Sequence, residues 1–560
     1  MTPPVVWSIA GNDSGGGAGL SADLRAATAF GVHLCPVVAA ITAQNSRAVT
    51  RIEPVSPDLL EAQLDALEGD LPPAAVKTGL LGSAAHIATV ARRIDRLRQR
   101  ASVALVVDPV LGASTGAAFA DEAALNAYRD LLLPRATVVT PNGREARMLA
   151  GEGGVPALAA ALKTLGAHSV SVTGGDDPHA VAGWALDWID TPHASGWLAL
   201  PCVAIPHTHG TGCTFATSVA CALALGFVPA DALILAKMAT TLALRQGYAA
   251  GQGAGPVAAR AGFGAQPDLL PWMSWGEETA FIKPEAIAQA PRPSRERGWG
   301  EGVHGSNTNN RAAQGSTPPL PQPLSSEGRG ERFREDIGVY AIVDSAERVR
   351  QVVAAGARTV QLRIKTPGDA PDAGWHAALR PSITQALAAC DAAGATLVVN
   401  DHWRLARELG APAIHLGQED LAALGAAGRA ELAASGLKLG ISSHSLWELC
   451  RARSLRPWYA ACGPVWPTLT KAMPWVAQGL DNLAWWVHMA GMPVVAIGGI
   501  LEPEQLLEAA RSGASGVCVV RGLGNEPAQT LPCWQAALAA GRAAPRLPVP
   551  ALPHPSLHGA

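Results

Sequence analysis

Two stretches of this chain combine residue types and spacing that suit the chemistry of phosphates. The first is GTGC, residues 210–213, where two glycines lead into Cys213 and an apolar, helix-like run follows. A helix start presents unpaired N–H groups and the positive end of the helix dipole, so it attracts anions and lowers the pKa of a cysteine. The pattern predicts an anion hole with Cys213 as a base or thiolate. The alternative is a small buried hydrophobic side chain at a helix start.

The second stretch is TVQLRIK, residues 359–365, which reads as a strand with two different faces. Its apolar residues suit packing under helices, whereas Gln361, Arg363 and Lys365 would point together into the interior of a barrel. Two buried cations without partners are very costly. They predict an anionic ligand, with internal salt bridges as the alternative.

Acidic and phosphate-binding residues follow the later strands of the same half. Asn400 and Asp401 end one predicted strand, and Asp420 follows the next. Carboxylates at neighbouring strand ends, opposite a cationic strand, suit Mg²⁺ held against a pyrophosphate, although one such aspartate could merely cap a helix. Barrels often bind phosphate through hydroxyls, cations and backbone N–H groups after their later strands. Candidates of this kind are Thr468, Thr470, Lys471, Gly498 and Gly499.

The elements that position these residues fall into two domains. Residues 1–264 alternate short apolar strands with helical patterns, which predicts a parallel sheet covered by helices. Residues 336–545 hold eight candidate strands separated by helix-length segments, which predicts a TIM barrel. Residues 265–335 read as a largely disordered linker rich in Pro, Gly and Ser, and residues 546–560 as a frayed Pro-rich tail. Three aromatic residues near the start of the linker could pack back on the first domain: Trp272, Trp275 and Phe281.

Composition narrows the function classes. The chain of 560 residues is 48% hydrophobic and 16% charged, with a formal net charge of −3, so neither nucleic acid nor an anionic membrane is an expected partner. Nine cysteines without a CxxC pair argue for a reducing compartment and against a disulfide framework or structural zinc. No signal peptide or membrane-spanning run is evident. The sequence predicts a cytoplasmic enzyme of small molecules and leaves a homo-oligomer possible.

A second glycine-rich stretch, GNDSGGGAGLSADL at residues 11–24, follows a strand and opens a helix. A dinucleotide fingerprint fails here because its third glycine would fall on Leu20. A P-loop is excluded because the chain contains no Gly-Lys dipeptide. The remaining alternatives are a phosphate-binding turn and a tight turn that only joins strand to helix.

The order SIAGNDSGGGAGLSADL, AAITAQN, VKTGLLG, VVDPVLG, VVTPNGREA, VTGG and THGTGCT resembles, along nearly all of residues 5–260, the hydroxymethylpyrimidine/phosphomethylpyrimidine kinases of thiamine biosynthesis. These have the ribokinase-like α/β fold. The resemblance implies that Cys213 activates the substrate hydroxyl. It also implies substrate contacts at Gly11, Asp23 and Gln44, an anion hole at Gly210 and Gly212, nucleotide contacts at Asn142 and Thr211, and Mg²⁺ ligands at Asp108 and Glu145. Thr173 stands where a lysine is expected, and the LGASTG loop also lacks one, so contacts there fall to hydroxyl or backbone groups.

The motifs QLRIK, ND, HLGQED, GPVWPTLTK and AIGGI, over residues 338–525, resemble thiamine-phosphate synthase. The family joins hydroxymethylpyrimidine diphosphate to thiazole phosphate and releases pyrophosphate. The resemblance implies that Mg²⁺ on Asp401 and Asp420 stabilises the departing pyrophosphate, together with Arg363, Lys365 and Lys471. It further implies diphosphate contacts at Gln361, Asn400 and Ser442, and thiazole-phosphate contacts at Thr468, Thr470, Gly498, Gly499, Val520 and Arg521. Trp466 replaces the usual phenylalanine, and Arg521 replaces a common serine.

The two resemblances support each other, because the product of the first half is the substrate of the second. They predict a fused enzyme that uses ATP and Mg²⁺. One rival interpretation is a pyridoxal-type kinase fused to an unrelated barrel enzyme, and another is a half that serves only as a ligand sensor or scaffold. The flexible linker predicts domains of independent orientation and a diphosphate that escapes into solution.

Overall fold

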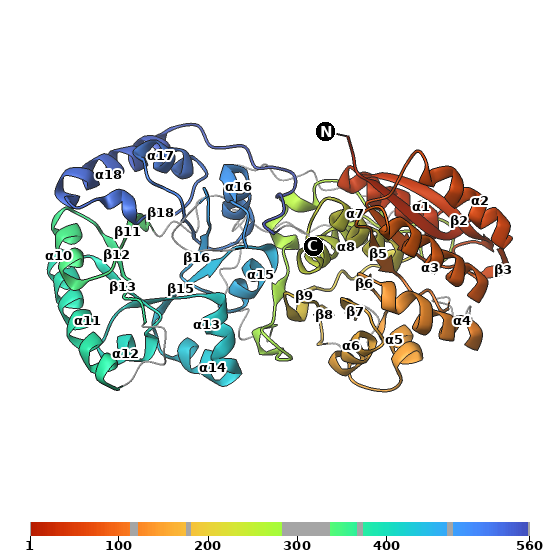
Figure 1. Ribbon diagram of the computed structural model, residues 1–560, viewed down its shortest axis with the longest axis horizontal. Coiled ribbons are helices and arrows are strands. Elements are labelled where there is room, and N and C mark those ends of the chain that lie inside the picture. The colour runs from red at the N-terminus through yellow and green to blue at the C-terminus, as the bar shows by residue number, and fades with distance from the viewer. Residues whose placement is uncertain are drawn as a thin grey trace, which may run out of the picture.

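The structure is a computed structural model that describes residues 2–112, 121–174, 181–282, 336–366, 373–467 and 474–557. Figure 1 shows two lobes side by side, with the first domain on the right and the second on the left. Thr468, Thr470 and Lys471 lie outside the described residues, as does most of the predicted linker. Among the described helices, none combines the length and the hydropathy needed to cross a membrane.

The first domain is built on one mixed sheet with the strand order β10-β9-β8-β7-β6-β5-β4-β1-β2-β3. Its central strands run parallel, whereas β3 at one edge and β8 to β10 at the other run antiparallel. The strands are β1 (Val5–Asp13), β2 (His33–Gln44), β3 (Val49–Pro54), β4 (Ala75–Thr78), β5 (Ala104–Val107), β6 (Val138–Val139), β7 (Val170–Thr173), β8 (Trp184–Asp190), β9 (Ser195–Pro201) and β10 (Trp272–Met273). This arrangement confirms the predicted ribokinase-like α/β domain.

Helices cover both faces of this sheet because its strands are apolar on both sides. In β1, Val6 belongs to the core on the side of α1, α7 and α8, whereas Trp7 belongs to the core on the side of α2 to α6. The helices are α1 (Gly19–Phe30), α2 (Pro57–Glu68), α3 (Ala84–Arg98), α4 (Glu122–Ala127), α5 (Gly143–Ala150), α6 (Val155–Thr164), α7 (Thr211–Ala224) and α8 (Pro229–Arg245). Parallel strands that are buried on both faces require such continuous apolar runs.

The second domain is a closed barrel of eight parallel strands, β11 to β18, in chain order. This confirms the predicted TIM barrel. The strands are β11 (Gly338–Val343), β12 (Thr359–Leu362), β13 (Thr396–Asn400), β14 (Ala413–Leu416), β15 (Lys438–Ser443), β16 (Tyr459–Cys462), β17 (Val494–Ala496) and β18 (Gly516–Val519). The surrounding helices are α10 (Ala346–Ala354), α11 (Ala373–Ala393), α12 (Trp403–Glu408), α13 (Gln418–Ala423), α14 (Gly425–Ala434), α15 (Leu446–Ser454), α16 (Gly479–Met489), α17 (Pro503–Arg511) and α18 (Pro527–Ala543).

The two domains pack against each other, and their buried apolar residues form a single cluster that includes Leu233 of α8 and Leu449 of α15. Hydrogen bonds also cross the boundary: Trp485 Nε1 donates to the Gly264 oxygen (2.7 Å), and Trp275 Nε1 donates to the Arg451 oxygen (3.2 Å). The expectation of independently oriented domains is therefore wrong. Apolar surface on α8 and α15 fixes the arrangement whatever the linker does.

Part of the predicted linker belongs to the fold. Strand β10 pairs antiparallel with β9, so the sheet of the first domain continues past residue 264. Trp272 lies in this strand, as predicted, whereas the Trp275 ring contacts Arg429 and Arg451 of the barrel. The described residues of the chain up to 282 therefore form part of the first domain rather than a free linker.

The expectation of a frayed tail is also wrong for residues 546–557. His554 N donates to Asn482 Oδ1 (2.8 Å) on α16, and Leu557 is buried. A Cβ added at Gly264 of the first domain would collide with the Ala551 oxygen. Figure 1 accordingly shows the C-terminus between the two lobes. Prolines suit this segment because it runs extended along surfaces that both domains provide.

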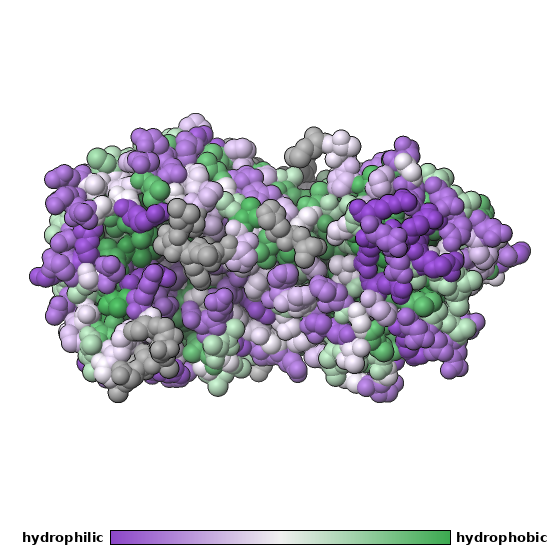
Figure 2. All heavy atoms as spheres, viewed as in Figure 1, coloured by the Kyte–Doolittle hydropathy of each residue, from purple (hydrophilic) through white to green (hydrophobic). Residues whose placement is uncertain are grey.

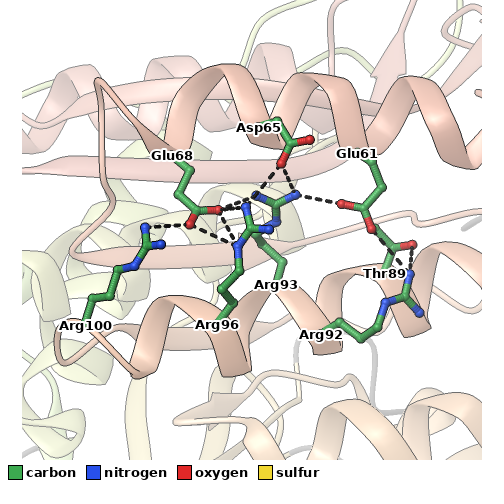
Figure 3. A network of polar contacts seen from close by, with 8 residues as sticks. All are labelled: Glu61, Asp65, Glu68, Thr89, Arg92, Arg93, Arg96 and Arg100. Carbon is green, nitrogen blue, oxygen red and sulfur yellow. Dashed lines mark hydrogen bonds and ion pairs between the residues drawn. The ribbon is translucent and has the colours of Figure 1, made fainter.

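A charge network joins α2 to α3 on the outer side of the first domain (Figure 3). The Arg93 side chain is 3% exposed and contacts Glu61 (2.7 Å), Asp65 (2.7 Å) and Glu68. Arg96 and Arg100 contact Glu68 from the solvent side. Figure 2 shows hydrophilic residues gathered over this region. Because Arg93 is enclosed by carboxylates, its removal leaves Glu68 partly unpaired in a buried place.

We expect Arg93→Ala to lower the local stability of α2 and α3 by about 2 kcal/mol, less than for a fully buried pair because Arg96 and Arg100 remain. Arg92→Ala is the matched control, since the Arg92 side chain is 66% exposed and meets only Glu61 at 3.3 Å among charged groups. Arg92→Ala should lower the local stability of α2 and α3 by less than about 0.5 kcal/mol. Native-state hydrogen exchange of the two helices measures both. Equal losses in the two variants would contradict this account.

Candidate active sites

The start of α7 leaves backbone donors uncapped. Gly210 is the N-cap residue in a left-handed conformation (φ 86°), and no side chain caps the helix. A Cβ added at Gly212 would meet no atom within 4 Å, so the first turn faces open space. The Thr211 hydroxyl donates to the Thr208 oxygen (2.6 Å) and so belongs to the turn that shapes this entrance. Open N–H groups at the positive end of a helix attract anions, and the anion hole at Gly210 and Gly212 remains a prediction.

The glycine-rich stretch after β1 is a tight turn around Asp13. The Asp13 carboxylate accepts hydrogen bonds from Gly15 N (2.8 Å), Gly17 N (3.0 Å) and Ala18 N (2.8 Å). A Cβ at Gly17 would collide with the His209 ring, and a Cβ at Gly210 would collide with the Gly17 oxygen. Glycines are therefore needed because this turn packs directly against the loop that leads into α7.

His209 links that turn to the end of β2. Its Nε2 lies 2.9 Å from Asp13 Oδ2 and 3.2 Å from Gln44 Nε2. Burial raises the pKa of Asp13, but hydrogen bonds from His209, Ala18 and Gly15 outweigh it and hold that pKa below its ordinary value. Because the Asp13 carboxylate can only accept, the Nε2 proton of His209 belongs to that bond. The Gln44 amide thus lies beside the entrance to α7, where its predicted role requires it.

The structure reverses the expected direction of the Cys213 pKa. Burial raises the pKa of the thiol to about 12, while the Lys77 ammonium and the Gly19 N–H act in the opposite direction. The helix start alone therefore does not produce a thiolate. The stabilisation that α7 offers is directed at an anion outside the helix.

Asp23 was expected to contact the substrate, but in the structure its carboxylate is buried and bound by other groups of the protein. Both of its oxygens lie 3.1 Å from Lys77 Nζ, and it accepts hydrogen bonds from Ser8 Oγ (2.6 Å) and Thr217 Oγ1 (2.7 Å). Asp23 and Lys77 are both 0% exposed. Gly11 is likewise buried and packs against Gly19, so neither residue presents a side chain to a ligand.

Asp108 and Glu145 form a carboxylate pair above that ion pair. Burial raises the pKa of Asp108 to about 6, although Lys77 at 3.7 Å lowers it. Burial and the charge of Asp108 raise the pKa of Glu145 to about 8. Asn142 and Glu145 form a reciprocal capping box at the start of α5 (Asn142 N to Glu145 Oε2, 3.0 Å), which holds this carboxylate in place. Mg²⁺ in phosphoryl-transfer sites commonly takes one or two carboxylates and completes its shell from substrate phosphates.

The carboxyl ends of the barrel strands bring the second group of predicted residues to one face. Active sites of this fold lie there. Gln361 and Asn400 are buried inside β12 and β13, whereas Ser442 is half-buried in β15. The other described candidates follow the ends of their strands: Arg363, Lys365, Asp401, Asp420, Gly498, Gly499, Val520 and Arg521.

The predicted strand over residues 359–365 ends earlier than expected. Strand β12 stops at Leu362, and Arg363 N donates to the Val343 oxygen (2.8 Å) just beyond it. Arg363 is half-buried and Lys365 is exposed at the rim, so only Gln361 is enclosed by the barrel. Within the described residues neither cation forms an ion pair, which argues against the internal salt bridges considered above.

The two acidic residues of the barrel mouth differ. Asp401 has φ 65°, a conformation that non-glycine residues rarely adopt and that is most often found at functional sites. Asp420 accepts a hydrogen bond from Gly417 N (3.0 Å) at the start of α13, so it does cap a helix, with its other oxygen available. No group of three or more His, Cys, Asp or Glu side chains able to hold a metal occurs among the residues that the structure describes.

A chain of hydrogen bonds crosses the barrel below Ser442. His415 Nε2 lies 2.8 Å from Ser442 Oγ, its Nδ1 lies 2.9 Å from Tyr459 Oη, and that oxygen lies 2.7 Å from Tyr340 Oη. Burial lowers the pKa of His415 to about 4, and the charges of Arg363 and His444 act in the same direction. The ring is therefore neutral and orients the Ser442 hydroxyl.

The candidate residues after β17 are glycines whose backbone conformation and close packing exclude a side chain. Gly498 (φ 94°) and Gly499 (φ 73°) pack so closely on Pro464 and Trp466 that no Cβ fits. Val520 is exposed, and Arg521 begins a short 3₁₀ turn, also exposed. Within the described chain Arg521 forms no ion pair, and its contact with a phosphate remains a prediction, with a side chain that points out to solvent as the alternative.

Sequence reasoning missed Asp13, His209, Lys77 and His415. His209 and His415 stand inside the motifs THGTGCT and HLGQED, so their place in a motif was the available signal. Asp13 stands at the end of a strand before a glycine run, a common place for a functional carboxylate. Lys77 gave a weaker signal, since a lysine in an otherwise apolar strand indicates only that an acidic partner lies elsewhere in the fold.

Known protein families match the two domains of the chain separately. Residues 13–258 match the family phosphomethylpyrimidine kinase, and residues 339–523 match thiamine monophosphate synthase. The chain is 41% identical to the hydroxymethylpyrimidine/phosphomethylpyrimidine kinase of Synechococcus elongatus, over 46% of this chain and 97% of that protein. It is 46% identical to the thiamine-phosphate synthase of Rhizobium etli, over 34% of this chain and 87% of that protein. The probable thiamine biosynthetic bifunctional enzyme, chloroplastic, of Oryza sativa subsp. japonica is 29% identical over 94% of this chain and 87% of its own length.

These matches favour the pyrimidine kinase over a pyridoxal-type kinase for the first half, and they give the barrel an activity of its own. The chain therefore belongs to the phosphomethylpyrimidine kinase family through its first domain and to the thiamine-phosphate synthase family through its second, and it is a bifunctional enzyme of thiamine biosynthesis.

Proposed function

We propose that the first domain transfers phosphoryl groups from ATP in two steps, first to the hydroxymethyl group of the pyrimidine and then to its monophosphate. The observation that supports this most directly is the uncapped start of α7 beside Cys213, open at Gly212. N–H groups already oriented there would stabilise the charge that develops on a transferring phosphoryl group. Gln44, beside His209, offers an amide donor and acceptor to the pyrimidine edge.

Asp108 and Glu145 are the residues that would hold Mg²⁺ on the nucleotide side. Their raised pKa values show that both carboxylates are poorly stabilised as anions by the protein alone, so the donor set suits a divalent cation. Mg²⁺ there would neutralise charge on the ATP phosphates. Asn142 holds Glu145 through the capping box. Lys77, which is paired with Asp23, holds Asp108.

For the barrel, we propose that Arg363 and Lys365 bind the diphosphate of the pyrimidine substrate, with Mg²⁺ on Asp401 and Asp420. The bond between the methylene carbon and the diphosphate oxygen breaks, and the cations stabilise the pyrophosphate that leaves. The thiazole nitrogen then forms the new bond to the methylene carbon. Ser442, oriented by His415, would contact the diphosphate, and Gly498, Gly499 and Arg521 lie where the thiazole phosphate would bind.

We propose a cytoplasmic location, because all nine cysteines are free thiols and thiols persist in a reducing compartment. The expected partners are small molecules: the pyrimidine and its phosphates, thiazole phosphate and ATP.

Cys213→Ala should reduce pyrimidine phosphorylation by ~10²–10⁴-fold and leave the coupling of supplied diphosphate unchanged, because it removes the proposed base from the first domain only. In the unmodified protein, kcat/KM for phosphorylation should rise with pH through pH 9. The raised pKa of Cys213 makes the thiolate the minor form below that range. Near-normal turnover in the variant would show that Cys213 is not the base and serves only as a small packed side chain.

Asp401→Asn and Lys365→Ala should each reduce coupling by ~10²–10³-fold and spare the kinase, because Lys365 would stabilise the leaving pyrophosphate directly and Asp401 would hold the Mg²⁺ that stabilises it. Asparagine is preferred at position 401 because it tolerates the positive φ that alanine does not. Circular dichroism should show unchanged folding. Equal loss of both activities would indicate misfolding and speak against these roles.

Thiamine phosphate should form when the purified protein is incubated with labelled hydroxymethylpyrimidine, thiazole phosphate, ATP and Mg²⁺, as detected by mass spectrometry. Unlabelled diphosphate added to this reaction should dilute the label in the product, because the two proposed sites lie in separate domains, at the start of α7 and at the barrel mouth, and diphosphate released from the first enters solution before it reaches the second. Undiluted label would show that the intermediate passes between the sites without release.

A further inference from the structure

One carboxylate of the kinase domain is buried in the boundary with the barrel. Asp231 is in the first turn of α8, is 2% exposed, and accepts a hydrogen bond on Oδ1 from Trp447 N of the barrel (3.0 Å). It also accepts from Leu446 N. Burial raises the pKa of Asp231 to about 7, while these two N–H groups lower it. Asp231 therefore holds a costly position, which its two donors in the other domain partly offset.

Those two donors are the first N–H groups of α15. A helix start leaves four N–H groups without partners inside the helix. The side chain of the N-cap residue Ser445 accepts a hydrogen bond from one of them, Glu448 N (3.4 Å). The Asp231 carboxylate provides an acceptor for two more, Trp447 N and Leu446 N. Helix α15 of the synthase thus depends on a residue of the kinase for its capping, and the positive ends of both α8 and α15 face the same carboxylate.

Helix α15 directly follows the strand that carries Ser442, and the connection is tightly bonded. His444 N donates to Glu448 Oε2 (2.5 Å), which ties the loop after β15 to the first turn of α15. Gln418 Nε2 donates to the Ser442 oxygen (3.2 Å) and to the Glu448 oxygen (3.2 Å), which joins strand and helix from the other side. A shift of the start of α15 would therefore move the end of β15.

We infer that Asp231, in the kinase domain, is a positioning residue for the synthase reaction: it caps α15 across the domain boundary and thereby holds Ser442 in place for the diphosphate substrate. The inference rests on the proposed role of Ser442. Other hydrogen bonds between the domains reach the later turns of α15, at Arg451 and Arg453, or other helices, such as His488 Nε2 of α16 to the Ala265 oxygen (2.9 Å). They secure the boundary without touching the corner between β15 and α15.

The test uses the full-length chain and compares KM and kcat of coupling with kcat of phosphorylation in the same preparation. Asp231→Ala should raise KM for the pyrimidine diphosphate about fivefold to tenfold, the size of a lost helix cap, with smaller changes in kcat and in phosphorylation. Asp231→Asn keeps an oxygen acceptor and should recover most of the affinity. His488→Ala, which removes a hydrogen bond across the same boundary, should leave both activities unchanged.

A double-mutant cycle separates the inference from the function on which it rests. Ser442→Ala should itself raise KM, and adding Asp231→Ala should then have little further effect, because both changes disturb one contact. An unchanged KM in Asp231→Ala, additive effects in the double variant, or equal loss of kinase and synthase activity would each overturn the inference. An unchanged KM in Ser442→Ala would instead remove the proposed role of Ser442.

Discussion

The packing of α8 against α15 carries the apolar core of the first domain into the barrel without a break. Each helix already covers its own sheet, so the surface that they share is what remains apolar after each domain has folded. Separating the domains would return this surface to water at a cost of roughly 25 cal/mol for each Å². Polar contacts within the boundary, such as Trp485 Nε1 to the Gly264 oxygen, then fix how the two surfaces meet. The boundary positions both active sites relative to each other.

Charge inside the first domain is arranged around Lys77. This buried ammonium binds Asp23 directly and lies 3.7 Å from Asp108, so three charged groups stay in the interior with partial neutralisation. The net result leaves Asp108 and Glu145 with raised pKa values and Cys213 as a thiol. The proposed binding of Mg²⁺ at these carboxylates and of nucleotide phosphates at the start of α7 rests on this balance.

The barrel interior combines apolar residues, such as Ile342 and Val398, with a line of polar groups. The line from Ser442 through His415 and Tyr459 to Tyr340 places hydroxyl and imidazole groups where branched aliphatic residues would otherwise pack. These groups satisfy one another, so burying them costs little. The benefit is a fixed orientation for the hydroxyl at the mouth. Among the described residues the Arg363 guanidinium forms no ion pair, and its binding to the diphosphate remains a proposal.

The sequence by itself determined the two folds and that most of the described candidates follow strand ends, because the carboxyl ends of parallel strands meet at one edge and local motifs mark those ends. It likewise placed Cys213 at a helix start. Only the tertiary structure decided how deeply groups are buried: Asp23 pairs with Lys77, 54 residues away, and burial reverses the expected pKa shift of Cys213. The tertiary structure also decided that residues 546–557 pack on the protein and do not fray. Proline-rich composition predicts fraying, but the surfaces that hold this segment exist only once both domains have folded and come together.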